Sequence, residues 1–524
     1  MKTLSALFRT AVLTVVAVWM AACGGSKSDY RNALPGNAML AVAFQPAQIA
    51  AKSGVDAGTM EQSPLYQRLV EQMNASGTLS AEEKEYVLSL LTHPEELGID
   101  GERAGYFFLA PLSEESFNPL FGVLLPVSDA AKFTALIDRI NAGSDFQTVQ
   151  EGDLSVVRIG EKENVTGLCA YNAGAVMCCF GQDSYEALLS YAKARFAAKP
   201  SESLYCDATV SEFFAGKNDV DVYLSYKDLM QFQNQLAVGP LPMADALAGI
   251  RMIASMNFEK GRIAATGRML YASKEAEEQM KAFYSYVREQ RGALLKYLPA
   301  KSVATVGFGL NGSEFYTTLS QMPGYGMMLA NPMVKQVFDA IEGDLAINFA
   351  GMLPGGAYPK ATLLCEVNDP AVVDNLVAAL PGMPVVKSSE GAYSFSMKGI
   401  TLFFGVKDKV LYATSDAEVK SALDGAKIDA LTGQESLFKG HVTAMCFDFV
   451  QLNTLLETYA NMSPQLRPLM EVLSLFADMQ AWGAEDRGEM VVHMQDKERN
   501  ALETICTTVS GMVAAALPAE AANE

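Results

Sequence analysis

Short runs of alternating apolar and polar residues recur along the chain and predict β-strands. In Tyr393–Met397, for example, every second side chain falls on the same side of an extended backbone. Such alternation is typical of antiparallel sheets that bury one face, whereas buried parallel strands are apolar throughout. Between these runs, apolar residues at helical spacing predict helices, as in 130–140 and 370–380. The mixture predicts an α+β fold with mainly antiparallel sheet.

The same order of predicted elements occurs twice, which indicates a tandem duplication. Leu34–Met39, which leads into a strand at 41–44, corresponds to Leu298–Val303, which leads into a strand at 305–308. Each copy then continues through strands and helices in one order and closes with a hairpin. The remaining matched segments are 101–109 with 343–349, 122–129 with 362–369, 130–140 with 370–380, 154–159 with 393–397, 165–171 with 400–406, 185–196 with 418–423, 220–226 with 443–449, and 253–269 with 481–494.

The duplication divides the chain into two predicted α+β repeats, residues 32–296 and 297–518. A chain of 524 residues is too long for one hydrophobic core, so two or more domains are expected. A long helix over Lys274–Leu298, stopped by Pro299, is expected where the repeats join. A loose tail, 519–524, follows the second repeat.

The N-terminal residues have the pattern of a bacterial lipoprotein signal. Lys2 and Arg9 supply a positive flank, and Ala11–Trp19 is apolar except for one threonine. Met20–Cys23 (Met-Ala-Ala-Cys) then places small residues directly before a cysteine. This arrangement resembles the lipobox, whose cysteine is lipidated and becomes the mature N-terminus. The apolar run is too short to span a bilayer.

The lipobox resemblance implies a location for the mature chain. We expect a signal peptide at 1–22, and a lipid anchor and tether at 23–31 with palmitate-type acyl chains on Cys23. Gly24 rather than aspartate follows the cysteine, so inner-membrane retention is not signalled and the outer membrane is expected. The tether lacks a dense acidic run, which favours the periplasmic face over the alternative, the cell surface. Eight residues reach less than about 30 Å, so the first repeat is expected near the bilayer.

The charge balance excludes some partners. Asp and Glu number 60 against 40 Lys and Arg, which gives a formal net charge of −20. A field of that sign repels nucleic acid and anionic lipid headgroups. Half of the residues are hydrophobic, so the chain is globular rather than disordered. We therefore expect no nucleic-acid partner, and membrane contact through the lipid on Cys23.

The seven cysteines after Cys23 are scattered, with no CxxC pair and no metal-ligand spacing. Most lie among apolar residues, which favours buried free thiols, because free cysteine packs as a small hydrophobic residue. Cys169 and Cys178 flank a turn at 172–174 and would face each other in a hairpin. An exported protein can form such a disulfide, so both interpretations stay open for this pair.

Catalytic and cofactor motifs do not emerge from the sequence. His93, His441 and His493 stand at non-equivalent positions of the two repeats, and none has the convergent partners that a general base or zinc site needs. One GxGxxG pattern, Gly307–Gly312, falls in a predicted strand outside a βαβ unit, which does not suit dinucleotide binding. We therefore expect no catalytic residues, no cofactor and no metal.

Four acids recur between the repeats, Asp129 with Asp369 and Asp183 with Asp416. Each stands where a helix is predicted to begin. Capping of the first helical turn and the helix dipole explain acids at such positions. We therefore assign these residues to capping rather than to chemistry.

Two apolar segments are candidate contact surfaces. The first, 322–333, is rich in methionine, a flexible residue that serves promiscuous contacts but also fills cores. Its candidate binding residues are Met322, Tyr325, Met327, Met328 and Met333. The competing interpretation is a turn and helix packed on their own sheet. The second, 236–248, would line a groove between the repeats or serve as an ordinary connection.

Several features together resemble one known family. These are the lipobox, the LPxxA-type entry into the first strand, the stretch Gly98–Phe108 (GIDGERAGYFF) and the two-copy layout. They resemble an uncharacterised family of lipoproteins from Bacteroides-type bacteria, classed as a domain of unknown function. The resemblance covers most of the mature chain and implies a lipid-anchored envelope protein with a duplicated α+β architecture. It implies no activity and no site residues.

The expected function is that of a non-enzymatic binding or scaffold module, with a protein or small-ligand partner in the groove between the repeats. Two alternatives stay open. An envelope hydrolase would need two convergent carboxylates about 5–10 Å apart in a cleft. A periplasmic chaperone or inhibitor would pair client strands along an open sheet edge.

Overall fold

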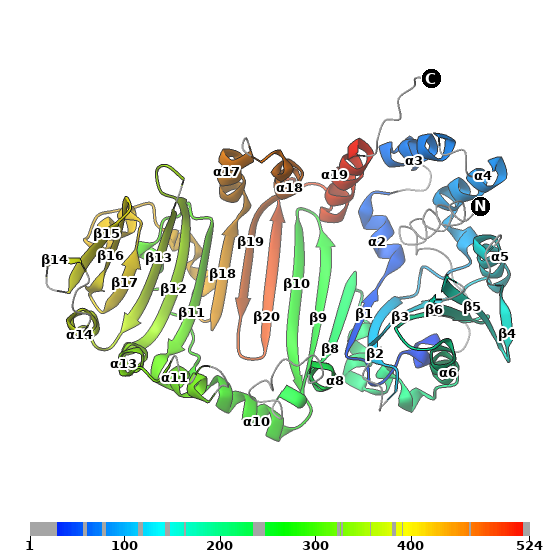
Figure 1. Ribbon diagram of the computed structural model, residues 1–524, viewed down its shortest axis with the longest axis horizontal. Helices are drawn as coiled ribbons and strands as arrows, with labels where there is room; N and C mark the ends of the chain where they lie inside the picture. The colour runs from blue at the N-terminus through cyan, green and yellow to red at the C-terminus, as the bar shows by residue number, and fades with distance from the viewer. Residues whose placement is uncertain are drawn as a thin grey trace. The chain divides into compact units, whose positions relative to one another are not determined.

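The computed structural model divides the chain into two compact units (Figure 1). Unit 1 comprises Met1–Val238, Ala248–Lys260 and Glu498–Glu524, and unit 2 comprises Gly239–Leu247 and Gly261–Lys497. The structure describes residues 29–516, except 56–59, 76–79, 114–118, 142–146, 162–163, 234–246, 322–324, 326–328, 357, 380–383, 390 and 461–462. Both units combine helices with antiparallel sheet, which confirms the α+β class.

Unit 1 is built on one antiparallel sheet. Its strands lie in the order β4 (Val149–Glu151), β5 (Leu154–Glu161), β6 (Asn164–Tyr171), β7 (Ala175–Phe180), β3 (Pro119–Pro126), β2 (Gly105–Pro111), β1 (Leu40–Phe44), β8 (Val220–Ser225) and β9 (Ile250–Glu259). The first strand in sequence, β1, therefore lies inside the sheet between β2 and β8.

Helices cover both faces of the unit 1 sheet. The helices of this unit are α2 (Pro46–Ser53), α3 (Pro64–Ala75), α4 (Ala81–Thr92), α5 (Ala130–Asn141), α6 (Tyr185–Phe196), α7 (Ala208–Phe214), α8 (Tyr226–Gln233) and α19 (Ala501–Ala516), with short 3-10 helices η1 (Tyr30–Ala33), η2 (Met60–Gln62), η3 (Pro94–Leu97), η4 (Pro200–Glu202) and η5 (Leu204–Cys206). One core joins α3, α4 and α5 to the sheet through residues such as Leu90, Phe133 and Val176. On the opposite face, α6 buries Leu188 and Ala192 against the same sheet.

Unit 2 is also built on one antiparallel sheet. Its strands lie in the order β14 (Val385–Ser389), β15 (Ala392–Met397), β16 (Ile400–Lys407), β17 (Val410–Thr414), β13 (Pro359–Val367), β12 (Ile341–Met352), β11 (Ala304–Asn311), β18 (Thr443–Asp448), β19 (Phe476–Gly483), β20 (Arg487–Met494) and β10 (Arg262–Tyr271).

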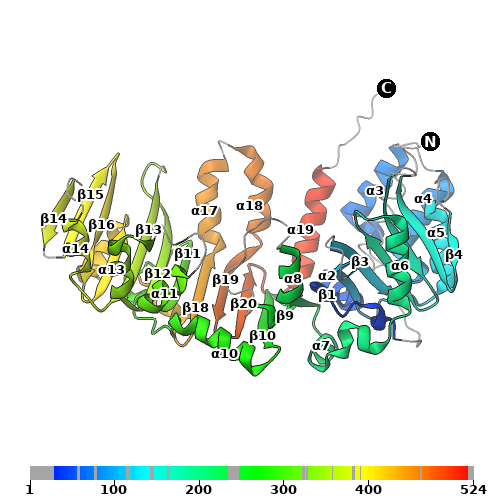
Figure 2. The same ribbon diagram turned by 60° about the horizontal axis from the view of Figure 1, so that its bottom comes forward.

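Some of the helices of unit 2 pack into two separate cores. The helices of this unit are α10 (Lys274–Phe283), α11 (Gly312–Ser320), α13 (Pro332–Ala340), α14 (Val372–Ala378), α15 (Ala417–Leu423), α16 (Glu435–Phe438), α17 (Phe449–Ala460) and α18 (Arg467–Leu473), with 3-10 helices η6 (Tyr284–Tyr286), η7 (Leu295–Tyr297), η8 (Leu431–Gln434) and η9 (Pro464–Leu466). One core joins η7, α15 and α16 to the sheet, and the other joins α13 and α14 to the opposite sheet face. Figure 2 shows α17 and α18 side by side near β18 and β19. Among the described helices, none is both long and apolar enough to cross a membrane.

The expected helix over Lys274–Leu298 is wrong, because α10 ends at Phe283. Gly292 adopts a left-handed φ of +72°, which interrupts a right-handed helix. The backbone N–H groups of Arg291 and Ala293 donate to the buried carboxylate of Asp344 instead of to helical carbonyls. The segment therefore follows the unit 2 sheet, and its leucines enter the core there.

The predicted repeats do not coincide with the compact units. Strand β10 belongs to unit 2, although it lies in the predicted repeat 32–296, and α19 belongs to unit 1, although it lies in the predicted repeat 297–518. The units are defined by contacts between residues in the folded structure, whereas the repeats are defined by the order of the predicted elements along the sequence. The duplication and its boundaries therefore stay predictions.

Two of the four recurring acids, Asp129 and Asp416, cap helices as the sequence indicates, whereas Asp369 closes the turn before α14, whose N-cap is Ala371. A carboxylate oxygen of Asp129 accepts a hydrogen bond from the Ala131 N–H, and Asp369 accepts one from Ala371, each at 2.9 Å. Asp416 caps α15 by accepting from the Glu418 N–H at 3.0 Å. At α6, the cap is Ser184 rather than the neighbouring aspartate.

Candidate functional site

Helix α5 encloses an apolar pocket against the unit 1 sheet. Its residues 133, 136, 137 and 140 repeat at helical spacing, so one apolar stripe faces the strands. The Asp129 cap and the carbonyl of Gly98, which accepts the N–H groups of Ser128 and Asp129, fix where this helix begins. We call the space beneath this stripe the α5 pocket.

The α5 pocket has a volume of about 200 Å³. Residues from the helix, from the segment after η3 and from strands β3, β5, β6 and β7 surround it. Its lining residues are Ile99, Leu125, Phe133, Leu136, Ile137, Ile140, Asn141, Val157, Arg158, Ile159, Gly160, Cys169, Val176, Cys178 and Phe180. The guanidinium of Arg158 stacks at 4.0 Å on the ring of Tyr185, a residue of α6 on the opposite sheet face. The surface that a ligand meets is therefore almost wholly apolar.

A disulfide forms part of this lining. Cys169 and Cys178 lie directly opposite each other in the β6–β7 pair and are bonded. This outcome corrects the favoured free-thiol prediction for these two residues, because the hairpin register brings their side chains together. Free cysteines in the described residues are Cys179, Cys206, Cys365, Cys446 and Cys506. Burial raises the pKa of the thiol of Cys179, the next residue of β7, to about 12, so this thiol remains protonated.

One polar group in the α5 pocket has no partner. The Nδ2 atom of Asn141, at the end of α5, is buried and makes no hydrogen bond with the described residues. Leaving an amide N–H group unpaired in this way costs about 1–3 kcal/mol. A ligand that presents an acceptor, such as a carbonyl oxygen, would remove this cost.

A row of phenylalanine rings extends from the pocket across the sheet. Phe180 lines the pocket, and its ring centroid lies 6.1 Å from that of Phe121 on β3. Phe121 is followed by Phe107 at 6.1 Å, and Phe107 by Phe44 at 4.9 Å. Phe121 is 43% exposed, so part of this row is open to solvent. We call these four residues the phenylalanine row.

Larger side chains occupy the corresponding place in unit 2. Strand pairing aligns Val157, Cys169 and Cys178 in unit 1, and the same strand positions in unit 2 hold Tyr393, Phe404 and Ala413. The rings of Tyr393 and Phe404 stack with centroids 5.7 Å apart. The hydroxyl of Tyr393 donates to Asp374 on α14, the counterpart of α5 in element order. Two rings therefore lie where unit 1 has a valine and a cysteine.

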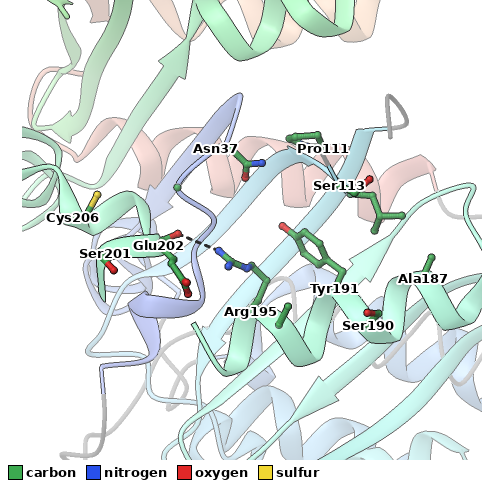
Figure 3. Close-up of a pocket in the computed structure, with 13 residues that line it drawn as sticks. Asn37, Pro111, Ser113, Ala187, Ser190, Tyr191, Arg195, Ser201, Glu202 and Cys206 are labelled. Atoms are coloured by element: carbon green, nitrogen blue, oxygen red, sulfur yellow. Dashed lines mark hydrogen bonds between the residues drawn. The ribbon is translucent and has the colours of Figure 1, made fainter. Parts of the chain in front are cut away.

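A second pocket lies on the opposite face of the unit 1 sheet, beside α6 (Figure 3). It is open to solvent, has a volume of about 710 Å³, and is called the α6 pocket here. Its lining comes from α6, the turn before β1, the end of β2 and η4–η5. The lining residues are Gly36, Asn37, Pro111, Leu112, Ser113, Ala187, Ser190, Tyr191, Ala194, Arg195, Ser201, Glu202 and Cys206.

Two buried acids that are close in sequence are candidates for the carboxylate pair of a hydrolase. Asp219 and Asp221 stand two residues apart at the start of β8, and both are at most 1% exposed. Asp219 forms an ion pair with Lys52 at 2.7 Å, and Asp221 accepts a hydrogen bond from Asn218 at 2.8 Å. Burial raises the pKa of Asp221 to about 6, and the Asn218 bond partly offsets that effect. Each carboxylate therefore has an internal partner, while the Oδ1 atom of Asp219 is buried and makes no hydrogen bond with the described residues.

The structure describes only part of the methionine-rich segment. Tyr325 is 43% exposed, and Met333 is half-buried in the first turn of α13. Met322, Met327 and Met328 lie outside the described residues, as do most of 236–248 and the lipidation candidate Cys23. The contact and lipidation predictions therefore stay predictions.

Sequence reasoning missed both pockets. The sequence predicts α5 as a helix with an apolar stripe, but the residues that this stripe faces come from four strands that are distant in sequence.

Gly307 and Gly309 both lie within β11, as the sequence indicates. Each histidine has a partner within the protein: His93 contacts Glu95, His441 stacks on Trp482, and His493 contacts Asp478.

Comparisons with known proteins give a family without an assigned activity. No curated protein matches the chain. Structures of crystal forms IV, I and III of TP0453 match at 13%, 12% and 13% identity, with TM-scores of 0.25, 0.24 and 0.24. They cover 46%, 50% and 51% of this chain, and 81%, 87% and 91% of TP0453. A family model described as a domain of unknown function, DUF4836, matches residues 30–438, so the chain belongs to the DUF4836 family.

Proposed function

We propose that this chain is a non-enzymatic, lipid-anchored envelope protein that binds an acyl chain in the α5 pocket. The observation that carries the proposal is the apolar lining of that pocket together with one unpaired amide, Asn141 Nδ2. Natural cores close-pack and leave few voids larger than a water molecule. A hydrophobic space of about 200 Å³ is therefore an exception that a ligand would explain.

The size of the pocket favours part of a longer molecule. An engineered apolar cavity of about 150 Å³ binds benzene, whereas sites for drug-sized ligands span about 300–1,000 Å³. The α5 pocket lies between these limits and suits one ring or a short hydrocarbon segment. The phenylalanine row, which starts at Phe180, offers an apolar surface for the rest of an extended chain. A carbonyl oxygen on that chain would satisfy Asn141.

The proposed anchor supports an acyl-chain ligand. We infer that Cys23 is lipidated and that the chain resides at the outer membrane, on its periplasmic face. Tyr30 docks on unit 1, where its hydroxyl donates to the Ala104 carbonyl at 2.5 Å. The seven residues from the anchor to Tyr30 reach at most about 25 Å. Unit 1 would therefore work close to the bilayer, where acyl chains are available.

We infer that the two α+β repeats arose by duplication and have since diverged in this site. The shared strand order supports this inference: β4-β5-β6-β7-β3-β2-β1-β8-β9 in unit 1 corresponds to β14-β15-β16-β17-β13-β12-β11-β18-β19 in unit 2. The first copy carries the pocket. The second copy has Tyr393 and Phe404 at the corresponding positions, so its role would be structural or directed at another partner.

The two other functions have weaker support. A hydrolase would need available carboxylates, but Asp219 and Asp221 are engaged internally. A strand-pairing chaperone would use an edge strand. Edge strand β4 has only three residues, and β14 carries Lys387, a residue type that discourages pairing at an edge.

Photocrosslinking tests the acyl-chain proposal in membranes. The full chain would be reconstituted in phosphatidylethanolamine vesicles that carry a diazirine-labelled acyl chain, and cross-linked peptides would be mapped by mass spectrometry. We expect cross-links within α5 and β5–β7. Val157→Phe should reduce them about tenfold by placing a ring in the pocket, which corresponds to about 1.4 kcal/mol of binding free energy.

The matched control is Val149→Phe, which introduces the same ring at a 49% exposed position of β4. It should leave the cross-links unchanged. Cross-links confined to the tether, or unaffected by Val157→Phe, would overturn the proposal. The anchor has a separate test: radiolabelled palmitate should label the wild-type chain and should not label Cys23→Ser.

A further inference from the structure

We infer that the α6 pocket is a second ligand site, which takes a small organic carboxylate through Arg195. This inference is independent of the acyl-chain proposal, because the two pockets lie on opposite faces of the unit 1 sheet and share no residue. It rests on the placement of one guanidinium group, on an unpartnered hydroxyl and on the size of the pocket.

Arg195 is held in the pocket with most of its donors unused. It stands in the last turn of α6, and its Nη1 atom donates to the Glu202 carbonyl at 3.2 Å (Figure 3). A guanidinium has five N–H donors, and no carboxylate among the described residues pairs with this one. The contact with Glu202 therefore orients the group without neutralising it.

The one acid among the lining residues, Glu202, has a hydrogen-bond partner other than Arg195. The carboxylate of Glu202 accepts a hydrogen bond from the Lys199 N–H at 3.0 Å and closes the turn of η4. The Glu202 carbonyl that Arg195 contacts is a neutral group. The positive charge of Arg195 is thus available to a ligand, and planar guanidinium matches the two oxygens of a carboxylate.

Tyr191 supplies a second group that lacks a partner. It lies one helical turn before Arg195, and both side chains project from α6 toward the pocket in Figure 3. Its hydroxyl is buried and makes no hydrogen bond with the described residues. Burial raises the pKa of Tyr191, so the hydroxyl keeps its proton and can donate it to a ligand oxygen.

The dimensions and charge of the pocket fit a small monoanion. A volume of about 710 Å³ falls within the range of small-molecule sites, about 300–1,000 Å³. Pro111, Leu112 and Ala194 offer apolar contact, and Asn37 and Ser190 offer hydrogen bonds. Arg195 is the one cationic side chain among the lining residues, and the carboxylate of Glu202 also lines the pocket. The site therefore suits the single charge of a carboxylate, whereas a dianionic phosphate would lack a second cation in a protein of net charge −20.

Fluorine NMR of the full chain tests this inference with 4-fluorobenzoate as the probe and 4-fluorobenzamide as its neutral counterpart. We expect the benzoate signal to broaden and shift on titration and the benzamide signal to stay unchanged. Arg195→Gln should weaken benzoate binding at least about tenfold, the effect of losing a charge-assisted contact. Tyr191→Phe should weaken it less, about threefold, and keeps the fold measurable if the arginine variant proves unstable.

Two controls separate this site from others. Lys193→Gln removes a positive charge from the same helix, but that lysine pairs with Glu151, so benzoate binding should not change. Val157→Phe should also leave it unchanged, because that residue lines the other pocket. Equal binding of benzoate and benzamide, or an unaffected Arg195→Gln, would overturn the inference. Displacement of benzoate by a lower concentration of inorganic phosphate would overturn the carboxylate assignment.

Discussion

Val157 in unit 1 and Tyr393 in unit 2 occupy the same place in strand order and register, yet one lines a pocket and the other lies in a closed core. Val157 lies opposite Cys169, and Tyr393 lies opposite Phe404. The valine is 5% exposed and contributes to a space of about 200 Å³, whereas the tyrosine packs with α14 residues and bonds to Asp374. The larger side chain of Tyr393 therefore fills the space beneath α14, whereas the smaller side chain of Val157 leaves a pocket beneath α5.

Truncation of Tyr393 should open a cavity in unit 2. Tyr393→Val removes a buried ring, so we expect the free energy of unfolding to fall by about 3 kcal/mol, measured by urea denaturation. Tyr393→Phe is the matched control, because it keeps the ring and loses only the hydroxyl donated to Asp374. It should cost about 1 kcal/mol. Equal losses in the two variants would show that the ring does not fill this core.

Reduction of the Cys169–Cys178 disulfide should destabilise unit 1. The bond closes a loop of sequence separation 9, and loop-closure entropy predicts a loss of about 2–3 kcal/mol. Urea denaturation with and without reductant measures this loss, and the double variant Cys169→Ala/Cys178→Ala should reproduce it. Cys206→Ala, at an exposed free thiol, serves as the control and should have no such effect. A denaturation midpoint that is indifferent to reductant would contradict the prediction.

Elements were predictable from the sequence where local pattern decides the structure. The alternation of Tyr393–Met397 predicts a strand, and β15 covers that segment. Helix caps at Asp129 and Asp416 were likewise readable, because a cap depends on neighbours within three residues. The prediction of one helix over Lys274–Leu298 is wrong because N–H groups of that segment donate hydrogen bonds to Asp344, which is distant in sequence.

The pockets depend on contacts that no local pattern encodes. The α5 pocket exists because residues from four strands and one helix leave space between them, and a single ring would close it. Arg195 resembles any arginine near a helix end, where cations favour the dipole. Its place in the pocket becomes visible only in the folded structure, where its guanidinium donates to the carbonyl of Glu202 in η4. Tertiary packing thus decides the candidate sites.

Asp221 should make stability depend on pH below neutrality. Burial raises its pKa from the ordinary 3.8 to about 6, so the folded chain binds a proton more tightly than the unfolded chain. Stability should therefore fall as pH rises from about 4 to about 6, by at most about 3 kcal/mol. Asp221→Asn keeps the oxygen that accepts from Asn218 and removes the titration. The free energy of unfolding, measured by urea denaturation at several pH values in this range, should change less with pH in the variant than in the wild type. An equal change with pH in both proteins would exclude Asp221 as the cause.

Gly98 should be essential for the position of α5. Its φ of +70° is strained for any residue with a Cβ, and an added Cβ would lie 2.5 Å from the Asp129 carbonyl oxygen and 2.7 Å from the Phe133 nitrogen. Both of these atoms belong to the first turn of the pocket helix or its cap. Gly98→Ala should therefore lower the free energy of unfolding by about 3 kcal/mol or more, and should also reduce acyl-chain cross-linking, because α5 must shift.

Gly152 separates backbone strain from steric clash in this test. Its φ of +71° is almost the same, but an added Cβ has no neighbour within 4 Å. Gly152→Ala should then cost only the strain, about 1–2 kcal/mol, with cross-linking unchanged. The difference between the two alanine variants, measured by urea denaturation, isolates the contact of Gly98 with α5. If the two variants lose equal stability, Gly98 does not set the position of the helix, and the pocket must be fixed by the strands.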